Sequence, residues 1–128
     1  MNVSFQKKLI IYKGKSFLKK NKTILVIQAR MLSTRLPGKV LKPINGISVL
    51  DYLITRIKNV SYIDEYWIAT STNKADDIIE ESYNSIINVF RGDEEDVLLR
   101  FYDLANMTKA KTIIRITADC PFADPSII

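Results

Sequence analysis

Residues 23–39 read TILVIQARMLSTRLPGK, a short apolar run followed directly by a loop with three cations and two hydroxyls. The run Thr23–Ala29 is rich in β-branched and apolar residues, which predicts a buried strand. The loop after it carries Arg30, Arg35 and Lys39 together with a Pro-Gly break. A buried strand that ends in a charged loop is typical of the ligand-binding edge of an α/β sheet.

The rest of the chain alternates between helical and strand patterns. Apolar residues at helical spacing, or short apolar runs, predict helices over 48–59, 75–85 and 94–107 and strands over 65–70, 86–90 and 111–117. Ser48 and Asn45 are alternative caps for the first helix. Strands that alternate with such helices imply right-handed βαβ units, so an α/β fold with a mainly parallel sheet is expected.

The charge of the chain is unevenly distributed. Residues 1–22 hold seven lysines and no acid, whereas the remaining residues hold 12 basic and 14 acidic side chains, a net charge of −2. We expect a basic N-terminal extension over 1–22, either solvated or in contact with an anionic membrane or RNA. The apolar run Leu9–Tyr12 is too short for a signal peptide. The single cysteine, Cys120, favours a cytoplasmic location, and neither nucleic-acid binding by the body nor stable membrane insertion is expected.

The loop after the first strand has the donors that a polyphosphate needs. Arginine forms forked hydrogen bonds to phosphate oxygens, lysine provides a mobile charge, and Gly38 permits close backbone approach. The loop is not a Walker A motif, because Val40 follows Lys39 and Ser33 stands where the first glycine belongs. The residues alone leave a phosphate-binding loop and a solvated charged turn as alternatives.

A second loop, Arg115–Pro121, follows the last predicted strand and contains Asp119. A carboxylate at this position either binds Mg²⁺ together with phosphate oxygens or caps the turn into Pro121. The chain has no histidine, so Cys120 cannot act in a Cys–His pair and is expected to be a thiol packed in the loop. Together the two loops suggest attack at the phosphorus of a nucleotide.

Four stretches, in order, resemble one known family. Residues 29–39, ARMLSTRLPGK, are similar to the signature of the cytidylyltransferases that activate acidic sugars, and the preceding Gln28 is most like the branch named for spore-coat polysaccharide biosynthesis. Residues 69–73, 89–100 and 115–125 also fit this branch. The resemblance, over 23–128, implies a Rossmann-like, three-layer αβα fold of the nucleotide-diphosphosugar transferase type. It implies transfer of CMP from CTP to a sugar with Mg²⁺, so CTP and a sugar are the expected partners.

Carried over by position, the resemblance also implies the roles of individual residues. The triphosphate would be bound by Arg30, Ser33, Arg35 and Lys39, of which Arg30 and Lys39 would neutralise charge as pyrophosphate leaves. Backbone groups of Gln28 and Ala29 would approach the base, Arg100 would line the nucleotide site, and Asp119 would hold Mg²⁺.

The chain departs from the branch pattern at several positions. Ala118 and Leu99 stand where glycine and an acid are usual, and the added methyl of Ala118 would crowd the nucleotide or cause strain if φ were positive. Family members continue beyond Ile128, so the sequence resembles their N-terminal portion, as a fragment, a natural truncation or one half of a two-chain enzyme. The exposed last strand favours a homo-oligomer. The alternative function is an inactive nucleotide-binding or assembly module.

Overall fold

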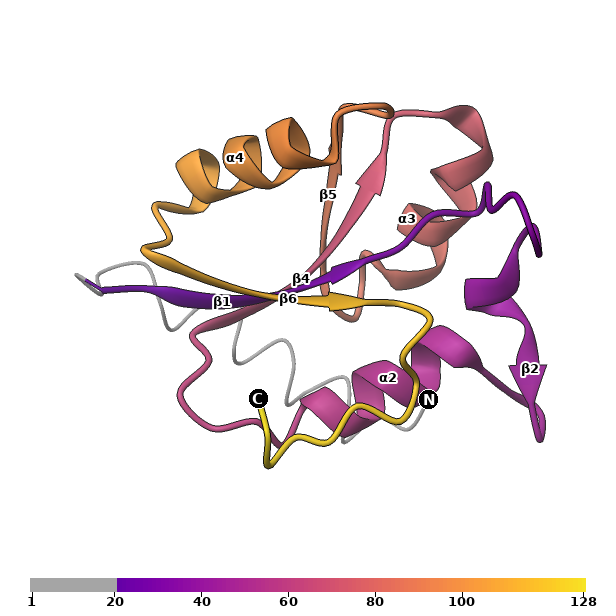
Figure 1. Ribbon diagram of the computed structural model, residues 1–128, viewed down its shortest axis with the longest axis horizontal. Coiled ribbons are helices and arrows are strands. Elements are labelled where there is room, and N and C mark those ends of the chain that lie inside the picture. The colour runs from indigo at the N-terminus through magenta and orange to yellow at the C-terminus, as the bar shows by residue number, and fades with distance from the viewer. Residues whose placement is uncertain (1–20) are drawn as a thin grey trace.

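The computed structural model describes residues 21–128, in which four strands form one parallel sheet (Figure 1). The strands are β1 (Thr23–Gln28), β4 (Glu65–Ser71), β5 (Asn88–Gly92) and β6 (Thr112–Thr117). Their order across the sheet is β5-β4-β1-β6, and each neighbouring pair is parallel. The predicted α/β class with a parallel sheet is thereby confirmed.

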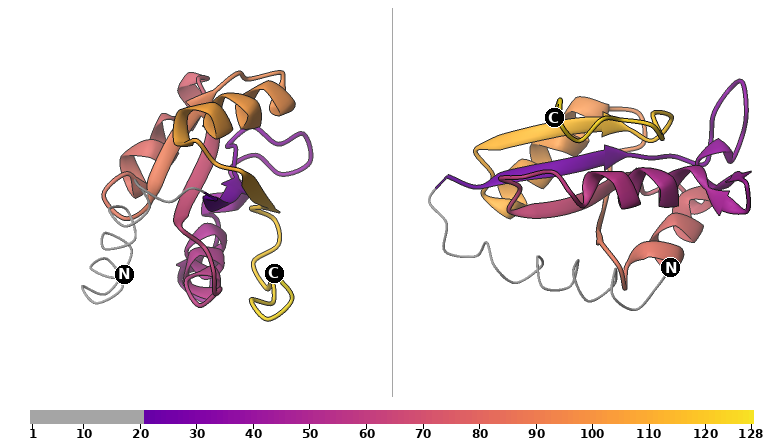
Figure 2. Two further views of the ribbon diagram at one scale, coloured as in Figure 1. Left: turned by 90° about the vertical axis from the view of Figure 1, so that its left-hand side faces the viewer. Right: turned by 90° about the horizontal axis from the view of Figure 1, so that it is seen from below.

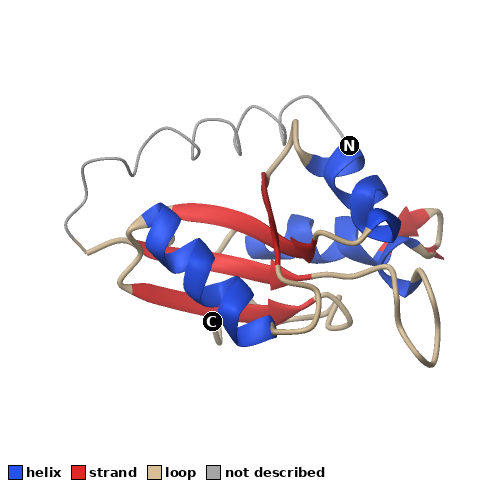
Figure 3. Cartoon of the chain, turned by 90° about the horizontal axis from the view of Figure 1, so that it is seen from above, coloured by secondary structure: helices blue, strands red, loops and turns tan. Residues whose placement is uncertain are grey.

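Helices cover both faces of the sheet and complete three layers (Figure 1 and Figure 2). The helix α4 (Val97–Thr108) lies across the strands on one face, as Figure 3 shows, whereas α2 (Val49–Ile57) and α3 (Asp77–Tyr83) pack on the other. Strand β1 contributes to both layers, because Leu25 and Ile27 join the cluster with α2 and α3, while Ile24 and Val26 join the cluster with α4. This two-sided burial explains the continuous apolar run in the sequence.

The strand β5 begins at Asn88, two residues after the predicted start. The backbone N–H groups of Ile86 and Ile87 donate to the Tyr83 carbonyl at 2.9 and 3.0 Å, so both residues still belong to the turn that ends α3. Their side chains are nevertheless buried. Apolar character therefore predicted the core position correctly but not the point where pairing with β4 begins.

The helix α4 begins at Val97 rather than at the predicted Glu94. Asp96 is its N-cap, since its carboxylate accepts a hydrogen bond from the Leu99 N–H at 2.8 Å. The residues before it form a turn in which the Asp93 carboxylate accepts two backbone N–H groups. Acidic side chains that compete for nearby backbone donors favour caps and turns over helix interiors, which moves the helix start.

A small hairpin, which the sequence analysis did not predict, leads into α2. Its strands are β2 (Pro43–Ile44) and β3 (Ile47–Ser48), joined by Asn45 and Gly46. Both turn residues have positive φ, 51° and 81°, as a two-residue hairpin turn of the mirror-image type requires. The Asn-Gly pair is a known signal for this turn, so the sequence did contain the information.

Ser48, and not Asn45, caps α2. The Ser48 hydroxyl oxygen accepts a hydrogen bond from the Asp51 N–H at 3.0 Å and lies 3.1 Å from the Tyr83 hydroxyl. The same side chain therefore starts α2 and ties it to α3. Burial raises the pKa of Tyr83 to about 12, so this hydroxyl stays protonated and available for hydrogen bonding.

The predicted basic extension over 1–22 lies almost entirely outside the described residues. Its last member, Lys22, is buried and forms an ion pair of 3.1 Å with Glu65, and the Lys22 carbonyl accepts the N–H groups of Lys111 and Thr112. This lysine thus belongs to the folded body. Within the described residues, no helix is both long and apolar enough to cross a membrane.

Substitution Ser48→Ala should lower the free energy of unfolding by about 1 kcal/mol, because it removes the cap of α2. Urea unfolding followed by circular dichroism measures this change. The matched control is Asn45→Gly, which keeps a residue that tolerates positive φ and removes the other candidate cap. A larger loss for Asn45→Gly than for Ser48→Ala would contradict the assignment of the cap.

Candidate functional site

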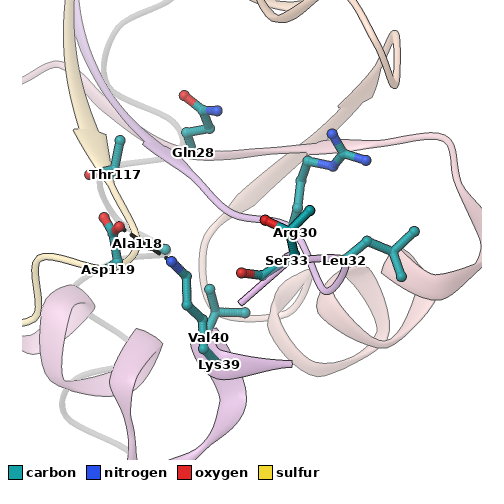
Figure 4. Close-up of a pocket in the computed structure, with 10 residues that line it drawn as sticks. Gln28, Arg30, Leu32, Ser33, Lys39, Val40, Thr117, Ala118 and Asp119 are labelled. Carbon is teal, nitrogen blue, oxygen red and sulfur yellow. Dashed lines mark hydrogen bonds and ion pairs between the residues drawn. The ribbon is translucent and has the colours of Figure 1, made fainter. Parts of the chain in front are cut away.

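A cavity lies where the strand order reverses, between β1 and β6. The chain passes from β1 to β4 and β5 on one side of the sheet, then crosses through α4 on the opposite face to reach β6 on the other side of β1. The loops after β1 and β6 therefore diverge at the carboxyl edge, which opens a crevice. The cavity has a volume of about 330 Å³ and is lined by Gln28, Arg30, Leu32, Ser33, Thr34, Lys39, Val40, Thr117, Ala118 and Asp119 (Figure 4).

A backbone hydrogen bond closes the loop after β1, in which the Gly38 N–H donates to the Met31 carbonyl at 2.7 Å. Gly38 has φ 70°, a conformation that a residue with a Cβ atom adopts only at a cost. The chain then enters the short helix η1 (Lys39–Leu41), where buried Val40 anchors the loop in the core. This turn returns Lys39 to the cavity wall.

Lys39 and Asp119 come from the two predicted loops and meet in the cavity. The Lys39 ammonium donates to the Asp119 carboxylate at 3.3 Å, with 36% and 52% of the two side chains exposed (Figure 4). A hydrogen bond from the Thr117 hydroxyl, and secondly the bond and charge of Lys39, lower the pKa of Asp119. The carboxylate is therefore ionised at neutral pH and accessible from the cavity.

The alternative role of Asp119, capping the turn into Pro121, is not what the structure shows. Its carboxylate faces Lys39, and Asp124 provides the side-chain acceptor in the following turn, bonding the Ser126 N–H at 2.9 Å. The predicted packing of Cys120 is wrong, because this thiol is exposed; it still lies near the Asp119 carboxylate, at 3.8 Å.

Arg30 lines the cavity but points away from Lys39 and Asp119 (Figure 4). Its guanidinium donates to Glu94 twice, to the carbonyl at 3.1 Å and to the carboxylate at 3.4 Å. The same oxygen of the Glu94 carboxylate also accepts a hydrogen bond of 2.8 Å from the Asn73 side-chain amide. The sequence analysis missed Glu94, although its place after a predicted parallel strand was a usable signal.

The structure does not bring Arg100 to the cavity. Its side chain is completely buried, and its guanidinium donates to the backbone carbonyls of Asp93 and Glu94 at 2.7 to 3.1 Å. Burial, and secondly the nearby charge of Arg30, lower the pKa of Arg100. Gly92 makes this packing possible, because a Cβ atom there would lie 2.6 Å from the Arg100 Cγ atom. Arg100 therefore supports the loop that holds Arg30.

Of the other predicted site residues, some line the cavity and others do not. Gln28 and Ser33 line the cavity, whereas buried Ala29 and exposed Arg35 do not. The Ala29 N–H already donates to the Ala69 carbonyl at 3.1 Å. The Gln28 side-chain oxygen accepts a hydrogen bond of 2.8 Å from Arg115, a residue with donors only, which orients the amide.

Ala118 is buried in the cavity wall at the end of β6, where its N–H donates to the Gln28 carbonyl at 2.9 Å. Among the described residues other than glycine, positive φ occurs at Asn45, Tyr62 and Lys109 only. The backbone strain considered for Ala118 is therefore absent, and its methyl group simply forms part of the wall.

Within residues 21–128, the cavity is lined by several hydrogen-bond donors and one carboxylate. The described part of the chain has no group of three or more His, Cys, Asp or Glu side chains that could hold a metal ion by themselves. Mg²⁺ commonly takes one or two carboxylates and completes its shell with water and substrate phosphate oxygens. An ionised, accessible Asp119 beside the donors that line the cavity fits this arrangement, provided that most ligands of the ion come from a substrate.

Comparisons with known proteins agree with this architecture. A family model described as cytidylyltransferase matches residues 24–128. The spore coat polysaccharide biosynthesis protein SpsF of Bacillus subtilis (strain 168) is 43% identical over 113 residues, covering 84% of this chain and 47% of the relative.

Two solved structures share the fold. A cytidylyltransferase from Leptospira borgpetersenii serovar Hardjo-bovis (strain JB197) has a TM-score of 0.78 and 35% identity, over 84% of this chain and 45% of that one. CMP:2-keto-3-deoxy-manno-octonic acid synthetase, solved in complex with CTP, has a TM-score of 0.70 and 25% identity, over 84% and 44%. This chain spans about half the length of the relatives that it matches. By its sequence and its fold, the chain belongs to the cytidylyltransferase family.

Proposed function

We propose that this chain is the nucleotide-binding part of an enzyme that transfers CMP from CTP to a sugar in the synthesis of a surface polysaccharide. The observation that carries the proposal is the meeting of Lys39 and Asp119 at the carboxyl edge of the sheet. The family supports the use of CTP, and the name of the Bacillus relative supports a role in polysaccharide synthesis. The sugar, a homo-oligomeric state and a cytoplasmic location stay predictions.

In this proposal the triphosphate takes the place of the carboxylates that pair with Lys39 and Arg30. Lys39 exchanges the Asp119 carboxylate for phosphate oxygens, and the Ser33 hydroxyl and loop N–H groups add further donors. Arg30 adds positive charge once phosphate competes with Glu94 for its guanidinium. Because both internal ion pairs are partly exposed, at 27–52% of each side chain, exchanging them costs little.

The reaction is an in-line displacement at the α-phosphorus. A sugar oxygen forms a bond to phosphorus, the bond from phosphorus to the bridging oxygen of the β-phosphate breaks, and pyrophosphate leaves. The proton of the attacking hydroxyl passes to solvent. Lys39 and Arg30 stabilise the charge that develops on the leaving pyrophosphate. Mg²⁺ held by Asp119 would supply further positive charge to the phosphate oxygens.

A second candidate is a module that binds the nucleotide without transferring it. One observation favours it: among the described residues that line the cavity, Asp119 is the single carboxylate. A lone carboxylate leaves most of the Mg²⁺ shell to substrate and water, which limits how firmly the metal is positioned. The two candidates differ in product formation and not in nucleotide binding.

Incubation of the chain with CTP, Mg²⁺ and a panel of acidic and neutral sugars should release pyrophosphate with at least one sugar. A coupled pyrophosphatase assay measures the release, and omission of the sugar is the control. Binding of CTP without release for any sugar would favour the binding module. Absence of CTP binding would contradict both candidates.

Substitution Lys39→Ala should weaken CTP binding roughly 10- to 100-fold, since it removes a charge-assisted hydrogen bond to phosphate. Isothermal titration calorimetry measures the affinity. Lys42→Ala is the matched control, because Lys42 is an exposed lysine three residues further on that does not line the cavity. Equal affinities for the two variants would exclude Lys39 from the phosphate site.

Substitutions Thr117→Val and Lys39→Met should each raise the pKa of Asp119 towards its ordinary value of 3.8. The reason is that the Thr117 hydroxyl lowers this pKa by a hydrogen bond, and Lys39 lowers it by a hydrogen bond and by its charge. A carboxyl ¹³C NMR titration of the ligand-free chain measures both shifts. An unchanged pKa in either variant would contradict the role of that residue.

A further inference from the structure

A completely buried carboxylate, Asp76, lies behind the loop that follows β1. It is the last residue of the short helix η2 (Lys74–Asp76) and precedes α3. One of its oxygens accepts a hydrogen bond from the Met31 N–H at 2.7 Å. The other accepts the Ser71 N–H at 3.3 Å and a short hydrogen bond from the Ser71 hydroxyl. The Asp76 carboxylate thus connects the end of β4 to the start of the loop.

The carboxylate of Asp76 does not serve its own helix. Although Asp76 occupies the N-cap position of α3, its side chain makes no capping hydrogen bond there. Among the described residues, no lysine or arginine forms an ion pair with it either. A buried carboxylate is costly unless hydrogen bonds compensate for lost hydration. Here all three compensating donors belong to Met31 and Ser71.

The same hydrogen-bond network returns to the neighbouring residue, Arg30. The Ser71 hydroxyl accepts the Asn73 N–H at 3.1 Å, the Asn73 amide donates to Glu94 at 2.8 Å, and Glu94 accepts Arg30 at 3.4 Å. Starting from Asp76, one connected network therefore holds both the Met31 backbone and the Arg30 side chain. These two residues are the first of the loop that we propose binds phosphate.

Only an acceptor without donors satisfies this position. The Met31 N–H, the Ser71 N–H and the Ser71 hydroxyl all donate to Asp76, whose carboxylate accepts on both oxygens. An asparagine of the same shape would turn its amide NH₂ towards either the Met31 N–H or the Ser71 N–H, so it cannot accept from both. The chemistry of the side chain, and not only its volume, therefore decides whether the loop start and the end of β4 are held together.

We propose that Asp76 is a positioning residue for triphosphate binding, because it fixes the start of the phosphate loop through the Met31 amide. The proposal rests on the proposed function, since the loop must bind phosphate for its positioning to matter. Asp76 itself does not line the cavity. Its effect should therefore follow the phosphate chain of a ligand and leave contacts with the nucleoside unchanged.

Substitution Asp76→Asn tests this inference with CTP, inorganic pyrophosphate and cytidine as separate probes. We expect affinities for CTP and pyrophosphate to fall roughly 10-fold or more, as for other small displacements of binding groups, and cytidine affinity to change less than about twofold. Amide hydrogen exchange by NMR should show faster exchange at Met31, with exchange at Leu25 and Val26 in β1 unchanged. Equal losses for all three probes, or no loss, would overturn the proposal.

The matched control is Thr108→Val at the end of α4. Thr108 is also buried, and its hydroxyl donates to the Leu104 carbonyl at 2.8 Å, remote from the loop. This variant should lower thermal stability and leave the affinities for CTP and pyrophosphate unchanged. If Thr108→Val weakens phosphate binding as much as Asp76→Asn does, general destabilisation explains the effect and the positioning role is wrong.

Wild-type protein provides a test that does not depend on the folding of a variant. In the ligand-free chain the Met31 amide should exchange as slowly as amides of β1, whereas exchange as fast as that of exposed Thr34 would contradict the role of Asp76. Failure of wild-type protein to bind CTP would contradict the proposed function instead. The exchange rate of Met31 would then still show whether Asp76 holds the loop.

Discussion

The strand β1 pairs with β4 along one edge and with β6 along the other, so that Ile24 lies opposite Glu65 on one side and Ile113 on the other. Its backbone is engaged in both directions, and residues 24–27 are completely buried. Because its two partner strands are reached by crossovers on opposite faces, the loops at its carboxyl edge must diverge. The cavity is a consequence of this strand order, and the loop residues provide its chemistry.

The charged side chains at the cavity are balanced within the protein. Lys39 pairs with Asp119 at 3.3 Å and Arg30 with Glu94 at 3.4 Å, both at partly exposed positions. Such pairs contribute little net stability, so exchanging either partner for another charged group costs little. The pairing compensates the charges within the cavity and leaves the side chains of Lys39 and Asp119 accessible.

Residues that do not line the cavity support these side chains. Gly92 leaves room for the aliphatic part of Arg100, whose guanidinium holds the carbonyls of Asp93 and Glu94. Asp76 accepts a hydrogen bond from the Met31 N–H. The preorganisation of a binding site depends on such contacts, because neighbouring residues fix the position of each functional side chain by packing and hydrogen bonds.

The sequence by itself determined the α/β class, the succession of strands and helices and the two loops that carry the site. Hydrophobic periodicity and the motif over 29–39 involve residues that are close together in the sequence, so they can be recognised without knowledge of the tertiary contacts. Tertiary structure alone decided that Asp119 faces Lys39, that Arg100 is buried and that Asp76 and Glu94 hold the loop start. Each of these contacts joins residues that lie far apart in the sequence, and sheet order and packing set their distance.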